Sequence, residues 1–343
     1  MKKRIVTFGE IMMRLNPSGY LRFLHAENFE ASYAGGEANV AVSLANFGMN
    51  AAFVSKVPTH EIGQCAVNAL RHYGVDTENM VRGGARLGLY FVEKGASQRA
   101  SKVIYDRAGS AIACASREDF DWDTIFEGAD WFHWTGITPA LGDNMVQACL
   151  EACKKAKEKG ITISCDLNYR KKLWTREKAG EVMAQLMPYV DVCIANEEDA
   201  ADVFGIHAEH TDIEGGKLDY AAYESVARQL SQRFGCKKVA ITLRGSISAS
   251  ENTWAGMLYD AATDKAVLSR SYHILIVDRV GGGDSFGGGL IYALSSGYND
   301  QDAINFAVAA SCLKHTIEHD FNQVKVDEVL ALMNGSGSGR VQR

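Results

Sequence analysis

The chain has 343 residues, of which 47% are apolar and 23% charged, and its net charge is −6. This composition is ordinary for a folded enzyme, and the acidic balance argues against a nucleic-acid binder, which usually carries a basic surface. No stretch approaches the roughly 20 apolar residues of a membrane-spanning helix, so no membrane partner is expected. The eight cysteines are irregularly spaced and form no C-x-x-C pair. This spacing favours reduced thiols and a cytoplasmic location.

Predicted strands and helices alternate along the chain. The strands cover 3–8, 51–57, 161–167, 191–195 and 238–243, and the helices cover 37–47, 62–73, 145–159 and 221–234. A glycine follows each of these helices, as is common at helix C-termini. Repeated strand–helix–strand units predict an α/β fold with a mostly parallel sheet covered on both faces, in a single domain that spans 1–334.

Two segments, 11–33 and 87–110, interrupt this alternation with short β-like runs and turns. Loops of that length without secondary structure are uncommon, so we expect both segments to form a small separate sheet, a lid over one edge of the main domain. The open edges of such a lid invite pairing, which predicts a homodimer or a higher homo-oligomer. The Gly-Ser-rich segment 335–343 is expected to be a flexible tail.

A glycine-rich element at 278–289 follows the β-rich run 272–277 and opens a predicted helix at 285–294. Gly281, Gly282 and Gly283 would present consecutive backbone N–H groups beside a helix N-terminus, which is an anion site. Asp284 at the helix start is a possible N-cap. A carboxylate beside a phosphate site also suits a base that deprotonates an alcohol during phosphoryl transfer.

Two commoner phosphate-binding loops do not fit this element. A dinucleotide fingerprint requires a third glycine where Phe286 stands, and a Walker A loop requires Gly-Lys-Ser/Thr, which is missing here. The element therefore belongs to a different class of phosphate-handling loop.

Segment 278–286 resembles the second signature, D-x-x-G-x-G-D-x-F, of the ribokinase-like (PfkB) carbohydrate kinases, and 35–41 resembles the first. The resemblance covers about residues 3–333. It implies a three-layer α/β/α domain with a β-sheet lid, ATP and Mg²⁺ as cofactors, and Asp284 as the catalytic base beside the Gly281–Gly283 amides. Arg279 departs from the small or β-branched residue found in many members. A monovalent cation near Asp278, as in several relatives, is left open.

The resemblance also implies nucleotide and metal sites. Asn196 and Asp199 match an N-x-x-E element that helps to place Mg²⁺, and the shorter Asp199 would act through water. A T-x-x-G turn at 242–246 and a helix at 307–315 would surround the nucleotide. The residues implied to bind ATP are Asn168, Asn196, Thr242, Arg244, Gly245, Ser246, Gly281, Gly283 and Ser311.

Two arginines indicate the acceptor. Arg107 lies two residues after Tyr105 and so on the same face of a lid strand, and Arg170 follows a buried strand at its carboxyl end. A guanidinium fork matches a carboxylate, so an anionic sugar is predicted. The predicted substrate-binding residues are Gly35, Gly36, Asn39, Tyr90, Tyr105, Arg107 and Arg170.

Within the family, this pattern resembles the 2-keto-3-deoxygluconate kinases, which implies ATP-dependent phosphorylation of that sugar acid to its 6-phosphate. The alternative is a fructokinase-like or other neutral-sugar kinase. A more distant alternative is a non-catalytic sugar sensor, which has no use for a base at Asp284.

Overall fold

The computed structural model describes residues 2–196, 198–208 and 220–335. At its centre is a nine-stranded sheet with the order β14-β13-β12-β11-β10-β9-β1-β4, and β15 also pairs with β13. All neighbours from β4 to β12 are parallel, whereas β13 pairs antiparallel with β12, β14 and β15. The strands are β1 (Arg4–Phe8), β4 (Asn50–Val54), β9 (Trp131–Thr135), β10 (Thr162–Asp166), β11 (Val192–Ala195), β12 (Lys238–Ser246), β13 (Glu251–Asp260), β14 (Lys265–Leu268) and β15 (Tyr272–Leu275).

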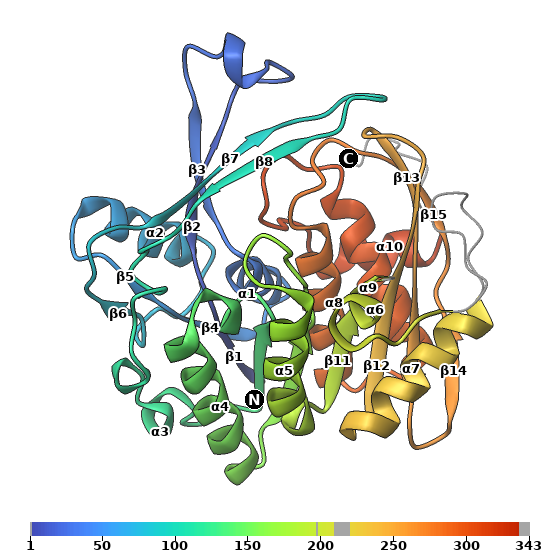
Figure 1. Cartoon of the computed structure of the whole chain (residues 1–343). Coiled ribbons are helices and arrows are strands. Elements are labelled where there is room, and N and C mark those ends of the chain that lie inside the picture. Colours follow the sequence, from blue (N-terminus) through green and yellow to red (C-terminus); the bar gives the residue numbers. More distant parts are fainter. Residues whose placement is uncertain (1, 197, 209–219, 336–343) are drawn as a thin grey trace.

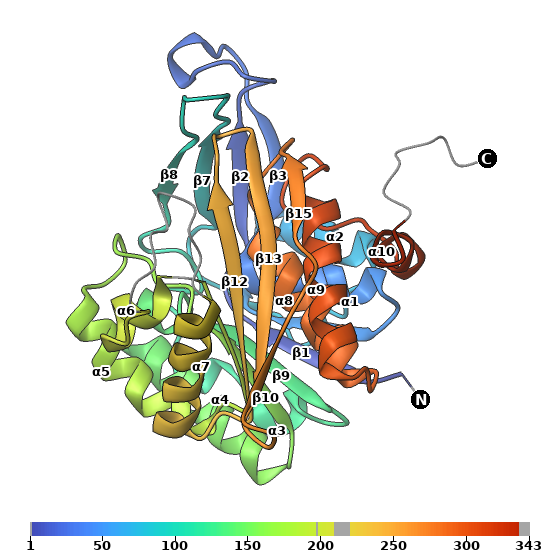
Figure 2. The same cartoon turned by 90° about the vertical axis from the view of Figure 1, so that its right-hand side faces the viewer.

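Helices cover both faces of this sheet (Figures 1 and 2). The helices α4, α5 and α7 share one apolar core with sheet residues such as Phe132 and Ile163. The helices α1, α8, α9 and α10 share the opposite core with residues such as Ile5 and Val192. The predicted three-layer α/β/α fold is therefore confirmed. The helices are α1 (Gly36–Asn46), α4 (Asp143–Glu158), α5 (Arg176–Leu186), α7 (Tyr220–Phe234), α8 (Gly282–Ser295), α9 (Asp300–Lys314) and α10 (Val326–Met333).

The lid is a second sheet with the order β3-β2-β7-β8, and it projects from the main domain (Figure 1). Its strands are β2 (Met12–Asn16), β3 (Glu30–Ala34), β7 (Gly88–Glu93) and β8 (Lys102–Asp106). They arise from the two segments that interrupt the α/β alternation, so the predicted smaller sheet is confirmed. Arg14, Tyr90 and Tyr105 form a row across this sheet. In the strand register, Arg14 on β2 lies opposite Tyr90 on β7, and Tyr90 lies opposite Tyr105 on β8.

Several predicted boundaries are wrong in informative ways. Helix α8 begins at Gly282, which places Asp284 inside the first turn instead of at the N-cap. Strand β12 continues to Ser246, because its antiparallel pairing with β13 continues to that residue. The predicted strand 51–57 is divided into β4 and the short β5 (Lys56–Val57), which pairs with β6 (Val81–Arg82) outside the main sheet. The predicted tail lies outside the described residues from 336 onward.

Two further expectations concern membrane segments and cysteines. Within the part of the chain that the structure describes, no helix has the length and apolar character to cross a membrane. All eight cysteines are free, and Cys149, Cys153, Cys165, Cys193 and Cys236 are buried. They pack inside the α4–α5–α7 core, as small apolar side chains do.

Candidate active site

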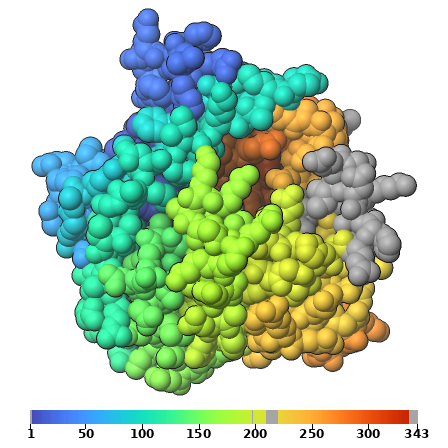
Figure 3. Space-filling view, in the orientation of Figure 1, coloured from blue at the N-terminus to red at the C-terminus, as the bar shows by residue number. Residues whose placement is uncertain are grey.

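A cleft of about 440 Å³ opens where the carboxyl ends of the parallel strands meet the lid. Open α/β sheets place ligands at this edge because the loops that follow the strands converge there. The space-filling view shows the hollow between the lid, the segment after β10 and the C-terminal third of the chain (Figure 3). Residues from both family signatures line it, together with Tyr90, Tyr105 and Arg107 from the lid side.

The glycine loop forms one wall of the cleft. Gly281 has φ +83°, and a Cβ there would lie 2.2 Å from the backbone oxygen of Asp320, so only glycine fits. Gly282 and Gly283 form the start of α8, where N–H groups have no helical partner. A Cβ on Gly283 would meet no atom within 4 Å, which leaves room for a ligand beside these amides. The loop therefore has the geometry of an anion site.

Asp284 lies beside the first signature. Its Oδ2 accepts a hydrogen bond of 2.6 Å from Asn39 Nδ2, although the two residues are 245 positions apart. A Cβ on Gly36 would be 3.6 Å from Asp284 Oδ1, so the chain passes close to the carboxylate. Burial raises the pKa of Asp284 to about 6, and the bond from Asn39 opposes that rise. A carboxylate with a pKa near neutrality is well suited to general-base catalysis.

Two further acids lie at the carboxyl ends of β10 and β11. Burial raises the pKa of Asp166 well above its usual range, and the nearby charges of Asp199 and Asp284 raise it further. Asp199 accepts bonds from the backbone N–H groups of Asn196 (3.0 Å) and Tyr169 (3.1 Å). Asn196 Oδ1 accepts bonds from the amides of Glu198 and Asp199. Asn196 and Asp199 thus cap the start of α6 (Asp199–Phe204) reciprocally.

These acids fit the needs of a nucleotide-bound Mg²⁺. That ion is usually held by one or two carboxylates together with substrate phosphates and water, not by a closed protein cage. In the described ranges, no group of three or more His, Cys, Asp or Glu side chains forms a metal cluster. Glu197, the second residue of the element, lies outside those ranges. Water-mediated binding by Asp199 stays a prediction.

Some predicted nucleotide-binding residues line the cleft and others do not. Asn168, Asn196, Thr242 and Arg244 line it. Asn168 has φ +41°, a conformation that Asn tolerates, and its backbone N–H donates to Asp166 Oδ1.

Gly245 and Ser246 belong to strand β12 instead of a turn, and neither lines the cleft. Ser311 does not line the cleft either, because it is fully buried. Its hydroxyl donates to the backbone oxygen of Gly282 at 2.7 Å, so it supports the glycine loop from behind.

Arg107 lies at the lid side of the cleft, just after β8. Its Nε and Nη2 both donate to Glu10 Oε2, while Ser110 Oγ donates to Glu10 Oε1 at 2.6 Å. Glu10 therefore already bonds two of the three nitrogens of the fork, and carboxylate binding by Arg107 stays a prediction. The N–H groups of Nη1 and the second N–H of Nη2 are left to meet a ligand while this ion pair holds. The guanidinium carbon also lies 5.5 Å from the ring centroid of Tyr105, which stacks on Tyr90 at 6.0 Å.

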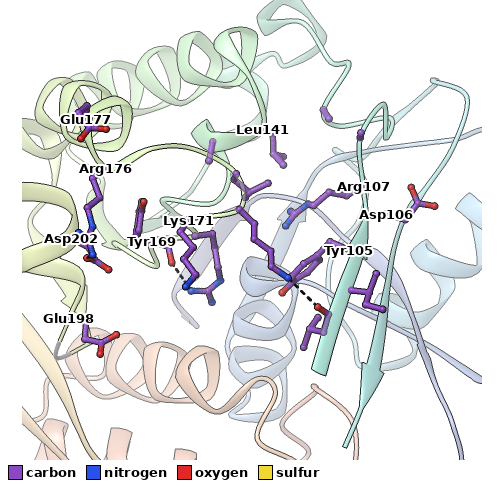
Figure 4. Close-up of a pocket in the computed structure, with 18 of the residues that line it drawn as sticks. Tyr105, Asp106, Arg107, Leu141, Tyr169, Lys171, Arg176, Glu177, Glu198 and Asp202 are labelled. Atoms are coloured by element: carbon purple, nitrogen blue, oxygen red, sulfur yellow. Dashed lines mark hydrogen bonds and ion pairs between the residues drawn. The ribbon is translucent and has the colours of Figure 1, made fainter. Parts of the chain in front are cut away.

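Arg170 lines the same cleft as Arg107. It is exposed, and its Nη1 donates to the backbone oxygen of Tyr169 at 3.0 Å. Both arginines and Tyr105 also line a wider cavity of about 1740 Å³ that adjoins the cleft. In Figure 4, Tyr105 and Arg107 approach this cavity from the lid, and Tyr169 and Lys171 approach it from the other side. The side chain of Lys172, in the segment after β10, reaches the lid and donates from Nζ to the Val103 backbone oxygen at 3.4 Å.

The cleft contains residues that the sequence analysis missed, among them Glu10, Asp166 and Asp320. Glu10 follows the predicted strand 3–8, and Asp166 lies near the carboxyl end of the predicted strand 161–167, so their positions in the sequence already indicated the site. Asp320 gave no such signal. It pairs with Arg14, 306 positions away in the sequence.

The comparisons with known proteins agree with this geometry. The model of the pfkB family of carbohydrate kinases matches residues 2–318. The chain belongs to this family. The kinase is 34% identical over 339 residues to the 2-dehydro-3-deoxygalactonokinase of Haloferax volcanii, with 99% of each chain covered. It is 28% identical over 343 residues to Fructokinase-1 of Oryza sativa, with 97% of this chain and 98% of the relative covered.

A solved structure is more similar still. The crystal structure of 2-dehydro-3-deoxygluconokinase from Thermotoga maritima matches with a TM-score of 0.93 and 49% identity, and covers 97% of this kinase and 100% of that chain. Family membership makes the kinase a phosphotransferase that acts on a carbohydrate, and it implies ATP and Mg²⁺ as cofactors.

Proposed function

We propose that this kinase transfers the γ-phosphoryl group of ATP to the terminal hydroxyl of a 2-keto-3-deoxy sugar acid. The proposed substrate is 2-keto-3-deoxygluconate, and its 6-phosphate is the product. The observation that carries this proposal is the presence of Arg107 and Arg170 in the same cleft as Asp284. The names of two similar sugar-acid kinases support it.

In the proposed mechanism, Asp284 accepts the proton of the terminal hydroxyl, and Asn39 holds the carboxylate in position. The amides of Gly281, Gly282 and Gly283 stabilise the charge on the transferring phosphoryl group. Mg²⁺ supplies charge neutralisation on the phosphates when it is bound, and Asn196 and Asp199 would hold it, with Asp199 acting through water. Thr242 and Arg244 contact the nucleotide.

The rest of the cleft orients the sugar acid. Arg170 and Nη1 of Arg107 bind its carboxylate, and the rings of Tyr90 and Tyr105 cover its carbon chain. Gly35, Gly36 and Asn39 meet its hydroxyls. Closure of the lid excludes water, which would otherwise compete with the sugar as acceptor.

The direct test is to incubate the purified kinase with ATP, Mg²⁺ and 2-keto-3-deoxygluconate, measure ADP release, and locate the phosphate by ³¹P and ¹³C NMR. We expect release that depends on the sugar acid and a phosphate on the terminal carbon. ADP release at the same rate without the sugar acid would contradict the proposal.

One observation favours a neutral-sugar kinase as the second candidate. Glu10 already neutralises Arg107, so the cleft carries less free positive charge than two open arginines would give. If fructose and ribose are phosphorylated as efficiently as the sugar acid, this second candidate takes over.

We further propose that the kinase is cytoplasmic and assembles as a dimer or a higher oligomer through the lid. Apolar side chains are exposed around the lid sheet, and Leu24 is 94% exposed. The others are Tyr20, Leu21, Phe29 and Ile104. Light scattering after gel filtration tests the assembly, and Leu24→Glu should shift it toward the monomer. A monomeric wild-type kinase at micromolar concentration would refute it.

A further inference from the structure

A buried ion-pair network lies beneath the glycine loop and joins it to the lid. Arg14 stands on lid strand β2, yet its side chain is wholly buried. Its Nη2 is 2.6 Å from Asp278 Oδ2 and its Nη1 is 2.5 Å from Asp320 Oδ1. Tyr90, the neighbour of Arg14 across the lid, donates to the other oxygen of Asp320 at 2.8 Å.

The two residues whose carboxylates hold Arg14 also contact the glycine loop, Asp278 through its carboxylate and Asp320 through its backbone. Asp278 Oδ1 accepts a bond of 3.1 Å from the amide of Val280, the residue before Gly281. Gly281 packs so closely on the backbone oxygen of Asp320 that no side chain fits between them. A shift of the Asp278 carboxylate or of the Asp320 backbone would therefore move the loop whose amides face the phosphoryl group.

Charge in this region is balanced by the chain itself. Lys314, a second buried cation, donates from Nζ to the backbone oxygen of Asp278 at 3.2 Å. Arg14 bonds the carboxylates of Asp278 and Asp320, and Lys314 interacts with both through their charges. Burial alone would lower the pKa of Arg14, but the charges of Asp320 and Asp278 outweigh it and hold that pKa above its usual value. Arg14 therefore stays charged under all working conditions.

We propose that Arg14 is a built-in cation of the phosphoryl-transfer site, a positioning residue that fixes the Gly281–Gly283 loop and makes a bound monovalent cation beside Asp278 unnecessary. Both oxygens of Asp278 already have partners, the guanidinium of Arg14 and the amide of Val280. A monovalent ion at this buried carboxylate would meet the positive charge of Arg14, 2.6 Å from Asp278 Oδ2. This inference rests on the kinase activity proposed above but not on which sugar is the acceptor.

The first experiment compares the wild type with Arg14→Ala in tetramethylammonium chloride, potassium chloride and guanidinium chloride at equal, low millimolar concentrations. The wild type should be equally active in all three salts. Arg14→Ala should lose kcat by on the order of 100-fold, the effect of an ångström-scale misplacement of a catalytic group, with a smaller change in KM for the sugar. Guanidinium or potassium should restore part of that loss, because either ion can enter the cavity between the two carboxylates.

Arg99→Ala is the matched control, because Arg99 also lies in the lid segment but pairs with Glu93, 3.1 Å away, instead of reaching the loop. It should behave like the wild type in every salt. Three results would overturn the inference: a wild type that requires potassium, an Arg14→Ala variant with normal kcat, or a loss that no cation restores, which would assign Arg14 a purely structural role.

If Arg14→Ala does not fold, the variant Asp320→Asn tests the same ion-pair network. The charged or polar groups that act on Asp284 are Asn39, Asp166, Asp320, Arg170 and Lys314. The charge of Asp320 contributes to the raised pKa of Asp284. Its removal should therefore move the acid limb of the kcat profile to lower pH and also reduce kcat, because Arg14 loses one anchor.

If Asp320→Asn kept both the acid limb of the kcat profile and the kcat of the wild type, the role of the network would be contradicted.

All these measurements use whichever sugar the wild type phosphorylates. A wrong substrate assignment therefore appears as an inactive wild type on the sugar acid and cannot be confused with failure of this inference.

Discussion

Arg107→Ala should weaken binding of the sugar acid far more than binding of ATP. A charge-assisted hydrogen bond contributes about 1.5–3 kcal/mol, so its loss should raise the KM for the sugar acid by roughly 10- to 150-fold. The ion pair with Glu10 adds to this effect. Without Arg107, the Glu10 carboxylate is left uncompensated and repels the carboxylate of the substrate.

Glu10 supplies the matched control for this repulsion. Glu10→Gln removes the competing charge and releases the guanidinium of Arg107, so the KM for the sugar acid should fall or stay the same. The double variant Glu10→Gln/Arg107→Ala should bind the sugar acid better than Arg107→Ala alone. The variant Arg107→Lys should restore only part of the binding of the sugar acid, because an ammonium lacks the planar fork that can bridge Glu10 and a ligand.

The assay couples ADP release to NADH oxidation at saturating ATP and is repeated with a neutral analogue that lacks the carboxylate. Arg107→Ala should narrow the preference of the wild type for the acid over this analogue, and the KM for ATP should barely change. An equal rise in KM for the acid and for the neutral analogue would refute the reasoning, because it would mean that Arg107 only supports the fold through Glu10.

Three further predictions concern the chemistry. Asp284→Asn should bind ATP, as isothermal titration would show, yet lose turnover by about 10²–10⁴-fold; near-normal turnover would remove Asp284 from the mechanism. Because the base works in its ionised form and the pKa of Asp284 is about 6, kcat should rise with pH through that value, and a flat profile across it would contradict the assignment. Asn196→Ala and Asp199→Ala should each raise the Mg²⁺ concentration needed for half-maximal rate, and unchanged titrations in both would count against the metal assignment.

The sequence predicted the features that are encoded locally. Alternating strand and helix patterns gave the layered fold, and the glycine-rich element identified the anion site and Asp284, because a loop, its glycines and its helix are adjacent in the chain. The interruptions at 11–33 and 87–110 likewise predicted the lid.

Contacts between distant segments could not be predicted in this way. Arg107 was predicted to bind a substrate carboxylate, but its bonds from two nitrogens to Glu10, 97 positions earlier, were not foreseen. Ser311 was expected at the nucleotide, but helix packing buries it behind Gly282. Residue type alone does not reveal which buried partner a polar side chain finds, since that depends on how the lid and the glycine loop meet in space.

The measurement that most directly tests the central claim is the ratio of kcat/KM for 2-keto-3-deoxygluconate to kcat/KM for fructose and for ribose, determined with one wild-type preparation under one set of conditions. The account predicts a ratio of at least about 10 in favour of the sugar acid, the contribution of a single charge-assisted contact. Fructose or ribose used as efficiently as the acid would contradict it and assign the arginines of the cleft to structure.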